Sequence, residues 1–531
     1  MFIHQTLERA RRLHPNREAV IDGERRLTYG ELGDRVDRLA GALASSGLEP
    51  GARAGVLMQN RHEYTETYFA VEQAGGVLVP LNQRLAPPEI AFVLNDAEAT
   101  HLLLDAAYLP LYQACAADLT TVRQIFIVGA EGSSPKGQAQ HAALPYEEAL
   151  VAATPLRGVT RDWQPEDMVQ LYYTSGTTGT PKGVMLTQGN VIANAAHAIM
   201  VMHFDERDVW IHATPMFHLA DAWASWTVTW VGGRHVYLRE FTPTGFLRTI
   251  QEHRVTVALL VPTMINAIVN EPRVREFDLS SLRLLAFGAS PMPVDRLRAA
   301  MAVMPSTTFI QLYGMTETAP FATALVYDEA TVNGPERAQR RLASCGREIP
   351  NVETRVVCED GSEVEPGEVG EIVMRGPNVM QGYWRQPEAS AAALRGGWMH
   401  SGDMATVDDE GYIFIVDRKK DMIITGGENV YSTEVENALY QHPAVLETAV
   451  IGVPDEHWGE RVHAVVVLKE GERAEPQELS DFCRRFIAGY KIPRSVEFVD
   501  ALPKTGSGKI QKGEIRERYW WEHEAATGRR V

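Results

Sequence analysis

The stretch Tyr173-Thr-Ser-Gly-Thr-Thr-Gly-Thr-Pro-Lys-Gly183 combines glycines and hydroxyl side chains with a single lysine. Glycines let the backbone approach a ligand closely, N–H groups and hydroxyls point at oxygens, and a lysine offsets negative charge. A second segment of this kind, Pro503-Lys-Thr-Gly-Ser-Gly-Lys509, lies near the other end of the chain. Two such loops predict one site that binds a nucleoside triphosphate and is closed by two domains.

The first loop departs from the common phosphate-binding patterns. A P-loop requires Gly-x-x-x-x-Gly-Lys-Ser/Thr, but the fifth residue after Gly176 is Pro181 and the fifth after Gly179 is Val184. The Gly-x-Gly-x-x-Gly spacing of protein kinases is also missing from this loop. Clusters of Ser, Thr and Gly are often plain linkers, yet the unbroken run of hydroxyl and glycine residues over 174–180 favours phosphate binding.

Further short segments lie between these two loops, in the following order along the chain. They are Pro215-Met-Phe-His218, Phe287-Gly-Ala-Ser290, Gln311-Leu-Tyr-Gly-Met-Thr-Glu-Thr318, Ser401-Gly-Asp403, Asp417-Arg-Lys-Lys-Asp-Met-Ile423 and Gly426-Gly-Glu-Asn-Val430. The whole series resembles the adenylate-forming superfamily: acyl-CoA synthetases, firefly-type luciferases and the adenylation domains of peptide synthetases. The resemblance runs from about Leu27 to Tyr519.

Bulk properties narrow the class of protein. A chain of 531 residues predicts two or more domains. The net charge of −18 argues against nonspecific binding to nucleic acid, whose phosphates it would repel. The four cysteines fit neither a zinc site nor a disulfide framework, so we expect reduced thiols and a cytoplasmic protein. Signal-peptide and membrane-spanning patterns are absent, although the sequence leaves association with a membrane surface open.

Alternating helix and strand signals in the first part of the chain predict an α/β architecture. The capping box Thr28-Tyr-Gly-Glu31 should begin a helix that stops near Gly47. Residues 129–143, rich in Ser, Gly, Gln and Ala, are expected to form an exposed loop. A further helix is expected over 64–71, and strands are expected over 56–58, 77–79, 257–261 and 284–287.

A second domain is expected to follow a charged joint. Short strands dominate from Thr354, where the resemblance implies a small β-barrel beside the larger α/β sheets. The joint Asp417-Arg-Lys-Lys-Asp421 follows a strand over 412–416. We therefore expect an N-terminal domain, 1–417, that binds ATP and the acid, and a small α+β C-terminal domain, 418–531, which the resemblance implies to be a mobile lid. Helices are expected there over 433–439 and 476–486, and strands over 448–453, 462–468 and 496–499.

The resemblance implies roles for residues around the phosphates. Lys509 should bridge the attacking carboxylate and the α-phosphate, because a cation offsets their mutual repulsion and stabilises the transition state. Thr316 should contact the α-phosphate, and Glu317 should hold Mg²⁺, which Thr174 also approaches. The β- and γ-phosphates should lie against Thr174, Ser175, Gly176, Thr177, Thr178, Gly179 and Lys182.

The nucleoside should be held by residues from later segments. Asp403 should accept hydrogen bonds from both ribose hydroxyls, because one carboxylate has lone pairs for two donors, with Arg418 as a second ribose contact. Tyr313 should stack on adenine, although packing in the core is an open alternative for this ring. The remaining nucleotide contacts that the resemblance implies are Gly288, Ala289, Ser290, Gln311 and Gly314.

The resemblance also implies a hinge and a site for CoA. Lys420 matches the hinge position, and rotation there would exchange one face of the small domain for another. The first face presents Lys509 to ATP and the acid. The second presents Gly426, Gly427 and Glu428, where missing side chains leave room for a pantetheine arm.

The acid pocket is the least defined part of the site. His218 matches a gate residue beside the acyl group, although a lone histidine is often structural. Trp223, Trp226 and Trp230 share one helical face by their spacing, and they either shorten the pocket or belong to the core. Other expected pocket residues are Met264, Gly288 and Gly314. A short aliphatic, thioether-bearing or aromatic acid would each fit.

These expectations predict an ATP- and Mg²⁺-dependent carboxylate–CoA ligase. The acid and ATP would give acyl-AMP and pyrophosphate, and CoA would then displace AMP to give acyl-CoA. Three alternatives stay open: an enzyme that loads a carrier protein, a luciferase-like oxygenase, and a sensor without catalysis. A homodimer is implied only at the level of the family.

Overall fold

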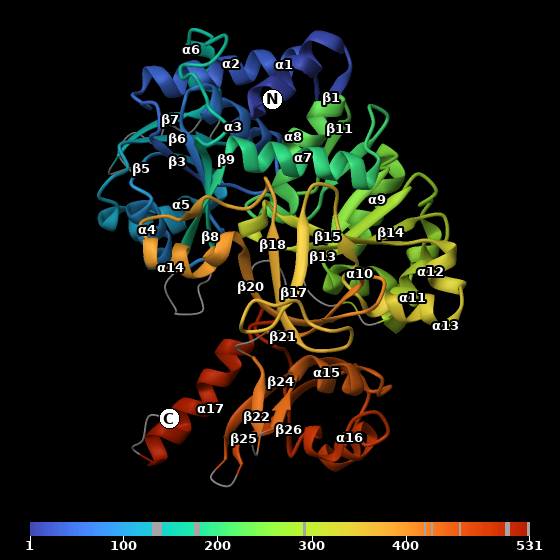
Figure 1. Ribbon diagram of the computed structural model, residues 1–531. Coiled ribbons are helices and arrows are strands. Elements are labelled where there is room, and N and C mark those ends of the chain that lie inside the picture. Colours follow the sequence, from blue (N-terminus) through green and yellow to red (C-terminus); the bar gives the residue numbers. More distant parts are fainter. Residues whose placement is uncertain are drawn as a thin grey trace.

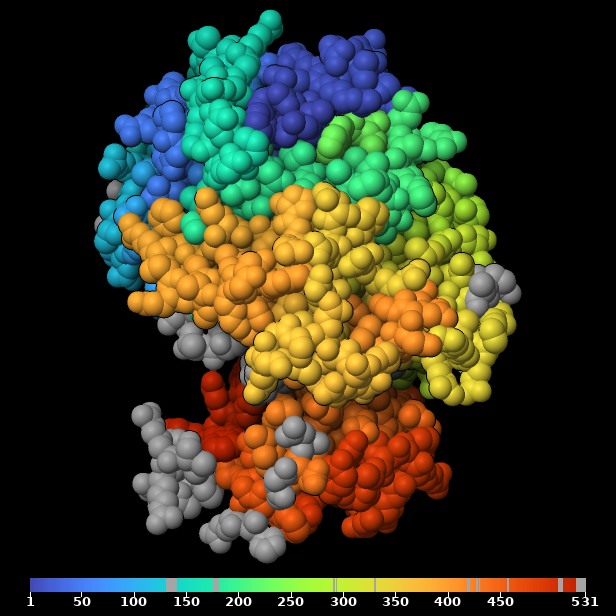
Figure 2. Space-filling model, in the orientation of Figure 1, coloured from blue at the N-terminus to red at the C-terminus, as the bar shows by residue number. Residues whose placement is uncertain are grey.

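The computed structural model describes residues 1–531 except 130–140, 175–180, 290–291, 293, 419–420, 426–427, 456–457, 505–509 and 528–531. The chain forms a large upper body and a smaller domain below it (Figure 1). The space-filling view shows the same division, with the smaller domain beneath a narrow waist (Figure 2).

The first part of the large body is an eight-stranded sheet. Its strands, in spatial order, are β19 (Gly382–Tyr383), β9 (Lys182–Thr187), β8 (Met168–Thr174), β4 (Val77–Pro80), β3 (Arg53–Leu57), β5 (Ala99–Asp105), β6 (Gln124–Val128) and β7 (Ala142–Pro145). The pairs from β8 to β7 are parallel, whereas β8–β9 and β9–β19 are antiparallel. Its helices are α2 (Tyr29–Ser45), α3 (His62–Gln73), α4 (Pro87–Asp96), α5 (Leu109–Cys115) and α6 (Tyr146–Ala152).

A nine-stranded mixed sheet forms the second part. Its order is β16 (Arg347–Glu348), β15 (Phe321–Tyr327), β14 (Thr308–Gly314), β13 (Leu284–Gly288), β12 (Val257–Leu260), β10 (Val209–His212), β11 (Arg234–Tyr237), β1 (Glu18–Asp22) and β2 (Arg25–Thr28). Helices of this part are α1 (Ile3–Leu13), α7 (Gln188–Met202), α8 (Leu219–Val231), α9 (Pro243–His253), α10 (Pro262–Val269), α11 (Val294–Val303), α12 (Glu329–Asn333) and α13 (Glu336–Arg340). The two sheets share one core, to which Val56, Trp226 and Ile310 belong.

The strand-rich region that we expected from residue 354 is a four-stranded antiparallel sheet. Its order is β17 (Glu353–Val357), β18 (Gly370–Arg375), β20 (Met399–Val407) and β21 (Ile413–Arg418), and α14 (Pro387–Ala393) lies between β19 and β20 in sequence. The strand order is open, so this subdomain is a half-barrel and not a closed barrel. It is built almost wholly from strands that are neighbours in sequence.

The small domain has its own core. Its sheet contains β22 (Ile423–Thr425), β23 (Glu428–Val430), β24 (Val445–Asp455), β25 (Gly459–Leu468) and β26 (Ser495–Phe498), with helices α15 (Ser432–Tyr440), α16 (Pro476–Cys483) and α17 (Lys512–Thr527). Ile423, Val435, Val450 and Leu479 are fully buried in one of its two clusters. A separate C-terminal domain is therefore present, and the position of its boundary after residue 417 stays a prediction.

A chain of polar contacts joins the two bodies. The buried carboxylate of Asp417, on β21, accepts a hydrogen bond from the backbone N–H of Ser432, the first residue of α15. Lys512 donates to Ser432 Oγ over 2.6 Å and pairs with Glu436 over 2.7 Å. The start of α17 and the start of α15 are thus tied to the last strand of the large body.

Local sequence signals account for several element boundaries. Thr28 accepts from the N–H of Glu31, whose carboxylate accepts from the N–H of Thr28, and the helix ends before Gly47 at φ +94°. The expected loop over 129–143 is wrong at its end, because residues 142–143 belong to β7 and pair in parallel with β6. Residues 130–140 lie outside the described residues.

The state of the cysteines and the character of the helices can be given for the described residues. Among the described residues all four cysteines are free thiols, and burial raises the pKa of Cys345 to about 12. No helix in the described parts of the chain has both the length and the apolar character needed to cross a bilayer.

Candidate active site

The first glycine loop is carried by the β8–β9 hairpin. Thr174 and Lys182 are direct partners in the antiparallel pairing, so both ends of the loop are held at one point. The loop itself, with the predicted contacts Ser175, Gly176, Thr177, Thr178 and Gly179, lies outside the described residues. The pairing shows how Thr174 and Lys182 come together.

Packing beneath the hairpin involves Tyr173 and Gly183 at its base. Tyr173 donates its hydroxyl hydrogen to Asp96 on α4, which anchors the end of β8. A side chain at Gly183 would be crowded, because a Cβ there would lie 3.0 Å from a methyl of Leu171 and 3.2 Å from Cβ of Trp384. The ends of β8 and β9 on either side of the loop are therefore held by these contacts.

Glu317 lies in a short 3-10 helix, Thr316–Thr318, that directly follows β14. Its side chain is buried, and Oε1 accepts a hydrogen bond from the hydroxyl of Tyr383 over 2.9 Å. The backbone oxygen of Glu317 accepts from the N–H of Met380 over 2.8 Å. A buried carboxylate beside hydroxyl side chains offers the oxygen ligands that Mg²⁺ prefers, so the residues present fit this cation.

Two predicted nucleoside contacts meet directly. The hydroxyl of Tyr313, on β14, donates to Oδ2 of Asp403, on β20, over 2.8 Å. Burial raises the pKa of Tyr313 well above its usual range, with the Asp403 charge adding to the effect, so the phenol stays protonated and remains a donor. Arg418 is the backbone partner of Asp403 in the β20–β21 pairing. The geometry brings Tyr313 and Asp403 into direct contact and places the backbone of Arg418 beside that of Asp403.

The loop before Asp403 fixes its backbone. Ser401 Oγ accepts from the N–H of Asp403 over 3.0 Å and donates to the backbone oxygen of Ile372 over 2.7 Å. The N–H of Gly402 donates to Glu371 over 3.1 Å, and Gly402 has φ +72°, a conformation that glycine adopts without strain. The Ser-Gly-Asp segment therefore sets the direction of the carboxylate.

The residues that we predict to contact adenine lie at the carboxyl ends of β13 and β14. Open α/β sheets commonly bind ligands at this edge. Gly288 is fully packed, since a Cβ there would lie 2.3 Å from the backbone oxygen of Leu312. Ala289 is exposed at φ +66°, a left-handed conformation that is strained for alanine and recurs at functional sites. Ser290 lies outside the described residues.

Gly314 and Gln311, the other two predicted nucleotide contacts on β14, have different surroundings. Gly314 must lack a side chain, because a Cβ would lie 1.9 Å from the backbone oxygen of Pro320. Oε1 of Gln311 accepts from the hydroxyl of Tyr327 over 2.6 Å, so this oxygen already has a protein partner. A role for Gln311 in nucleotide binding stays a prediction.

His218 is the N-cap residue of α8, where its backbone oxygen accepts from the N–H groups of Asp221 and Ala222. Its ring lies 4.3 Å from that of Phe217, centre to centre. Burial, with a smaller contribution from Arg84, lowers the pKa of His218 to about 4, so the imidazole is neutral near pH 7. Within the described residues its Nε2 is buried without a hydrogen-bond partner, which leaves that nitrogen for a ligand.

A buried polar network that the sequence did not reveal supports this segment from below. Asp221 is fully buried and binds Nδ1 of His212 and the hydroxyl of Thr214. The amide of Asn60 donates to the backbone oxygens of His212 and Thr214 and accepts from the N–H of Met216. The path of the chain into His218 is thus set by hydrogen bonds from α8 and from the end of β3.

The tryptophans of α8 belong to the core. Trp223 and Trp226 have no exposed surface, and Trp223 packs edge-on against Trp210 and Phe321 with ring centres 5.0 and 5.1 Å apart. Trp226 packs against Tyr68. Trp230 is only partly buried and packs against the same core. The idea that these rings shorten the acid pocket was wrong for Trp223 and Trp226, because the helical face meets protein side chains.

Most of the predicted hinge and CoA contacts cannot be compared with the structure. Lys420, Gly426, Gly427 and the catalytic candidate Lys509 lie outside the described residues. Glu428 begins β23 and is exposed. The two ends of the second glycine loop are described: Lys504 and Ile510 form an isolated antiparallel bridge, which gives the loop a narrow neck.

Tyr383 is a site residue that the sequence analysis missed. Besides its bond to Glu317, its ring lies under the ammonium of Lys182, 5.1 Å from Nζ to the ring centre. The only sequence signal was its place in a Gly-Tyr-Trp run before the helix at Pro387. That run becomes meaningful only once β19 is seen to pair with β9.

Comparison with known proteins agrees with this geometry. A family model described as "AMP-binding enzyme" matches residues 7–384, and one described as "AMP-binding enzyme C-terminal domain" matches residues 434–509. A feruloyl-CoA synthase of Amycolatopsis sp is 43% identical over 512 residues, covering 96% of this chain and 98% of that protein. An indoleacetate–CoA ligase of Aromatoleum aromaticum is 36% identical, covering 97% and 98%.

A solved structure shows the same fold along nearly the whole chain. The o-succinylbenzoate CoA synthetase of Bacillus subtilis, in complex with its acyl-adenylate intermediate, superposes with a TM-score of 0.83 at 31% identity, covering 96% of this chain and 97% of that one. Together with the two family matches and the nucleotide-site geometry, this similarity decides the class. The chain belongs to the AMP-binding enzyme family, as an AMP-forming acid–thiol ligase that uses ATP, Mg²⁺ and CoA.

Proposed function

We propose that the protein joins an aromatic carboxylic acid to CoA through an acyl-AMP intermediate. The observations that carry the proposal are the bond of Tyr313 to Asp403 and the two contacts of Tyr383, which link Glu317 to Lys182 of the β8–β9 hairpin. The choice of an aromatic acid rests on the relatives, which are named for ferulate and indoleacetate. A short acid no longer has support from the tryptophans, because Trp223 and Trp226 pack in the core.

In the first step a carboxylate oxygen of the acid attacks the α-phosphorus of ATP, and pyrophosphate leaves. Thr174, Lys182 and the loop between them would bind the phosphates that leave, and Thr316 would bind the α-phosphate. Glu317 and Thr174 would hold Mg²⁺, which supplies positive charge to the phosphate oxygens. Lys509 would bridge the two anionic reactants.

In the second step the thiolate of CoA attacks the acyl carbonyl, and AMP leaves with the electrons of the broken C–O bond. Asp403 and Tyr313 would keep the AMP half of the intermediate in place during the attack. Rotation of the small domain about Lys420 would replace Lys509 with the segment at Gly426, Gly427 and Glu428. The neutral imidazole of His218 would lie beside the acyl group, where its unpartnered Nε2 offers a hydrogen bond.

The test is a profile of AMP release with purified protein, ATP, Mg²⁺ and CoA. Ferulate, indoleacetate and phenylacetate would be compared with butyrate, octanoate, palmitate and 3-methylthiopropionate. The proposal expects kcat/KM for at least one aromatic acid to exceed that of every aliphatic acid by about tenfold or more, a difference of roughly 1.4 kcal/mol. A preference for palmitate or for the thioether acid would overturn the aromatic assignment.

The same assay separates the remaining alternatives. AMP release that does not depend on CoA, together with acylation of an added carrier protein, would identify a carrier-loading enzyme. Oxygen consumption or light emission would identify an oxygenase. Pyrophosphate exchange that is absent with every acid would identify a sensor.

A further inference from the structure

One side chain contacts two of the phosphate-site candidates that the structure describes. Tyr383 donates its hydroxyl hydrogen to Oε1 of Glu317 over 2.9 Å, and its ring lies 5.1 Å from Nζ of Lys182. Glu317 follows β14 of the nine-stranded sheet, whereas Lys182 begins β9 of the eight-stranded sheet. Tyr383 therefore connects the two sheets at the place where triphosphate and metal are expected.

The backbone of Tyr383 is held from three directions. It pairs with Val184 on β9, and its N–H donates to Ser390 Oγ over 2.8 Å. The next residue, Trp384, donates its backbone N–H to the oxygen of Gly183 over 2.7 Å and its indole N–H to the oxygen of Asp96 over 2.9 Å. A two-residue strand would ordinarily be weak, but these bonds fix the direction of the tyrosine side chain.

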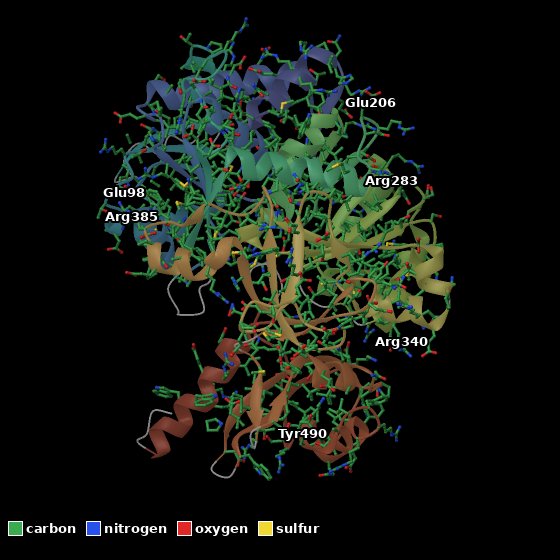
Figure 3. The ribbon with its side chains drawn as sticks, viewed as in Figure 1. Glu98, Glu206, Arg283, Arg340, Arg385 and Tyr490 are labelled. Atoms are coloured by element: carbon green, nitrogen blue, oxygen red, sulfur yellow. The ribbon has the colours of Figure 1, made fainter. Side chains whose placement is uncertain are left out.

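An ion pair at the surface holds the residue that follows Trp384. Arg385 has φ +55° and binds Glu98, and the two side chains lie beside each other at the edge of the large body (Figure 3). The guanidinium of Arg385 also lies over the ring of Trp384, 5.4 Å from its centre. The segment after Tyr383 is thus attached to the turn after α4, and little freedom remains for the tyrosine to turn away.

We propose that Tyr383 is a positioning residue that sets the Mg²⁺-binding carboxylate of Glu317 and the phosphate-binding ammonium of Lys182 in register with each other. The proposal rests on the proposed function, which gives Glu317 and Lys182 those roles. The hydroxyl fixes the orientation of the carboxylate by a charge-assisted hydrogen bond. The ring face attracts the ammonium and restrains a flexible side chain.

The two contacts can be separated by substitution. Tyr383→Phe keeps the ring, and with it the packing and the contact to Lys182, but removes the hydroxyl. Tyr383→Leu removes both contacts. Tyr108→Phe is a matched control, because Tyr108 also donates its hydroxyl to a side-chain oxygen, that of Gln83, over 2.7 Å, and lies in another part of the large body.

The experiment measures binding and not only turnover. The full-length proteins are titrated with Mn²⁺ in the presence of α,β-methylene-ATP and followed by electron paramagnetic resonance, and nucleotide affinity without metal is measured by calorimetry. Tyr383→Phe is expected to weaken Mn²⁺ affinity by roughly tenfold, the usual cost of a lost charged hydrogen bond, and to leave metal-free nucleotide affinity unchanged. Tyr383→Leu is expected to weaken both, and Tyr108→Phe neither.

The outcomes are decisive for the proposal. Unchanged Mn²⁺ affinity in Tyr383→Phe, with its melting temperature equal to wild type, would overturn it, as would equal losses of metal and nucleotide affinity in that variant. The proposed function fails by a different result, namely no AMP from any acid with the wild-type protein. The binding measurements need no acid, so the two failures can be told apart.

Discussion

The hydroxyl of Tyr313 lies 2.8 Å from Oδ2 of Asp403 and joins a strand of the nine-stranded sheet to a strand of the half-barrel. Ninety residues separate the two in sequence. The ring that we predict to stack on adenine and the carboxylate that we predict to bind the ribose are thus parts of one hydrogen-bonded unit. A substitution of either residue should therefore change the affinity for the same nucleotide.

Asp403→Asn should raise the KM for ATP by roughly tenfold, because the amide keeps the bond from Tyr313 but offers fewer lone pairs to the ribose hydroxyls. Initial rates of AMP release measure the effect. The effect should be much smaller with 2′-deoxy-ATP, which already lacks one of the two hydroxyls. Asp409→Asn, at an exposed ion pair with Arg337, is the control. Equal penalties with both nucleotides would contradict a ribose contact.

Lys509→Ala should abolish acyl-AMP formation and spare the second step. The lysine is needed where two anions meet, and not where a thiolate attacks an acyl-AMP that is already formed. Pyrophosphate exchange measures the first step, and acyl-CoA formation from synthetic acyl-AMP measures the second. Lys504→Ala is a matched control at the neck of the same loop, where Lys504 pairs with Glu447 over 2.6 Å. Similar losses in both steps would argue against this role.

Asp221→Asn should destabilise the large body by about 3 kcal/mol, because the side chain is fully buried and anchors His212 and Thr214. Urea unfolding followed by tryptophan fluorescence measures the change. Thr214→Val, which removes only the longer bond of 3.2 Å, should cost about 1 kcal/mol. If the network positions His218, the soluble Asp221→Asn protein should also show a raised KM for the acid with little change in that for ATP.

His197 provides a test of stability against pH. Burial lowers its pKa from 6.5 to about 4. Between these two pH values the unfolded chain binds a proton at this histidine and the folded chain does not. The free energy of unfolding therefore falls as the pH drops from 6.5 towards 4. Across that window the loss should approach about 3 kcal/mol for this residue. His197→Leu should make the fall shallower by that amount.

The measurement is the melting temperature of both proteins between pH 7.5 and 4.5, with the difference at pH 7.5 as the reference. His4 and His62, whose pKa is raised, act in the opposite sense and are present in both proteins. Parallel curves for the wild type and His197→Leu would contradict the assignment.

Elements with strong local signals were predictable from the sequence. Thr28 and Glu31 form a complete capping box, which predicted the start of α2. Two short apolar runs predicted buried strands, and they form β12 and β13. The α/β class and the separate small domain followed from such runs and from the charged joint near Asp417. Residues 142–143 were misassigned because β7 is a half-exposed edge strand that depends on pairing with β6.

Contacts that depend on distant pairing could not be predicted. The spacing of Trp223 and Trp226 correctly placed them on one helical face, but only the fold shows that this face meets Trp210, Phe321 and Tyr68. Tyr383 lies about two hundred residues from the hairpin that it supports, and its two-residue strand has no periodicity to detect. The resemblance supplied Tyr313 and Asp403 as nucleotide contacts, yet not their bond to each other.

The carboxylate of Asp417 gives the joint between the bodies an energetic preference. It belongs to the last strand of the upper body and holds the first N–H of α15, while Lys512, three residues beyond Lys509, binds the same turn of that helix. A rotation of the small domain must either keep these hydrogen bonds or replace them with hydrogen bonds to water. These few polar contacts at one helix start would oppose the rotation that we propose for the small domain, and their strength would affect how readily the enzyme passes from one half-reaction to the next.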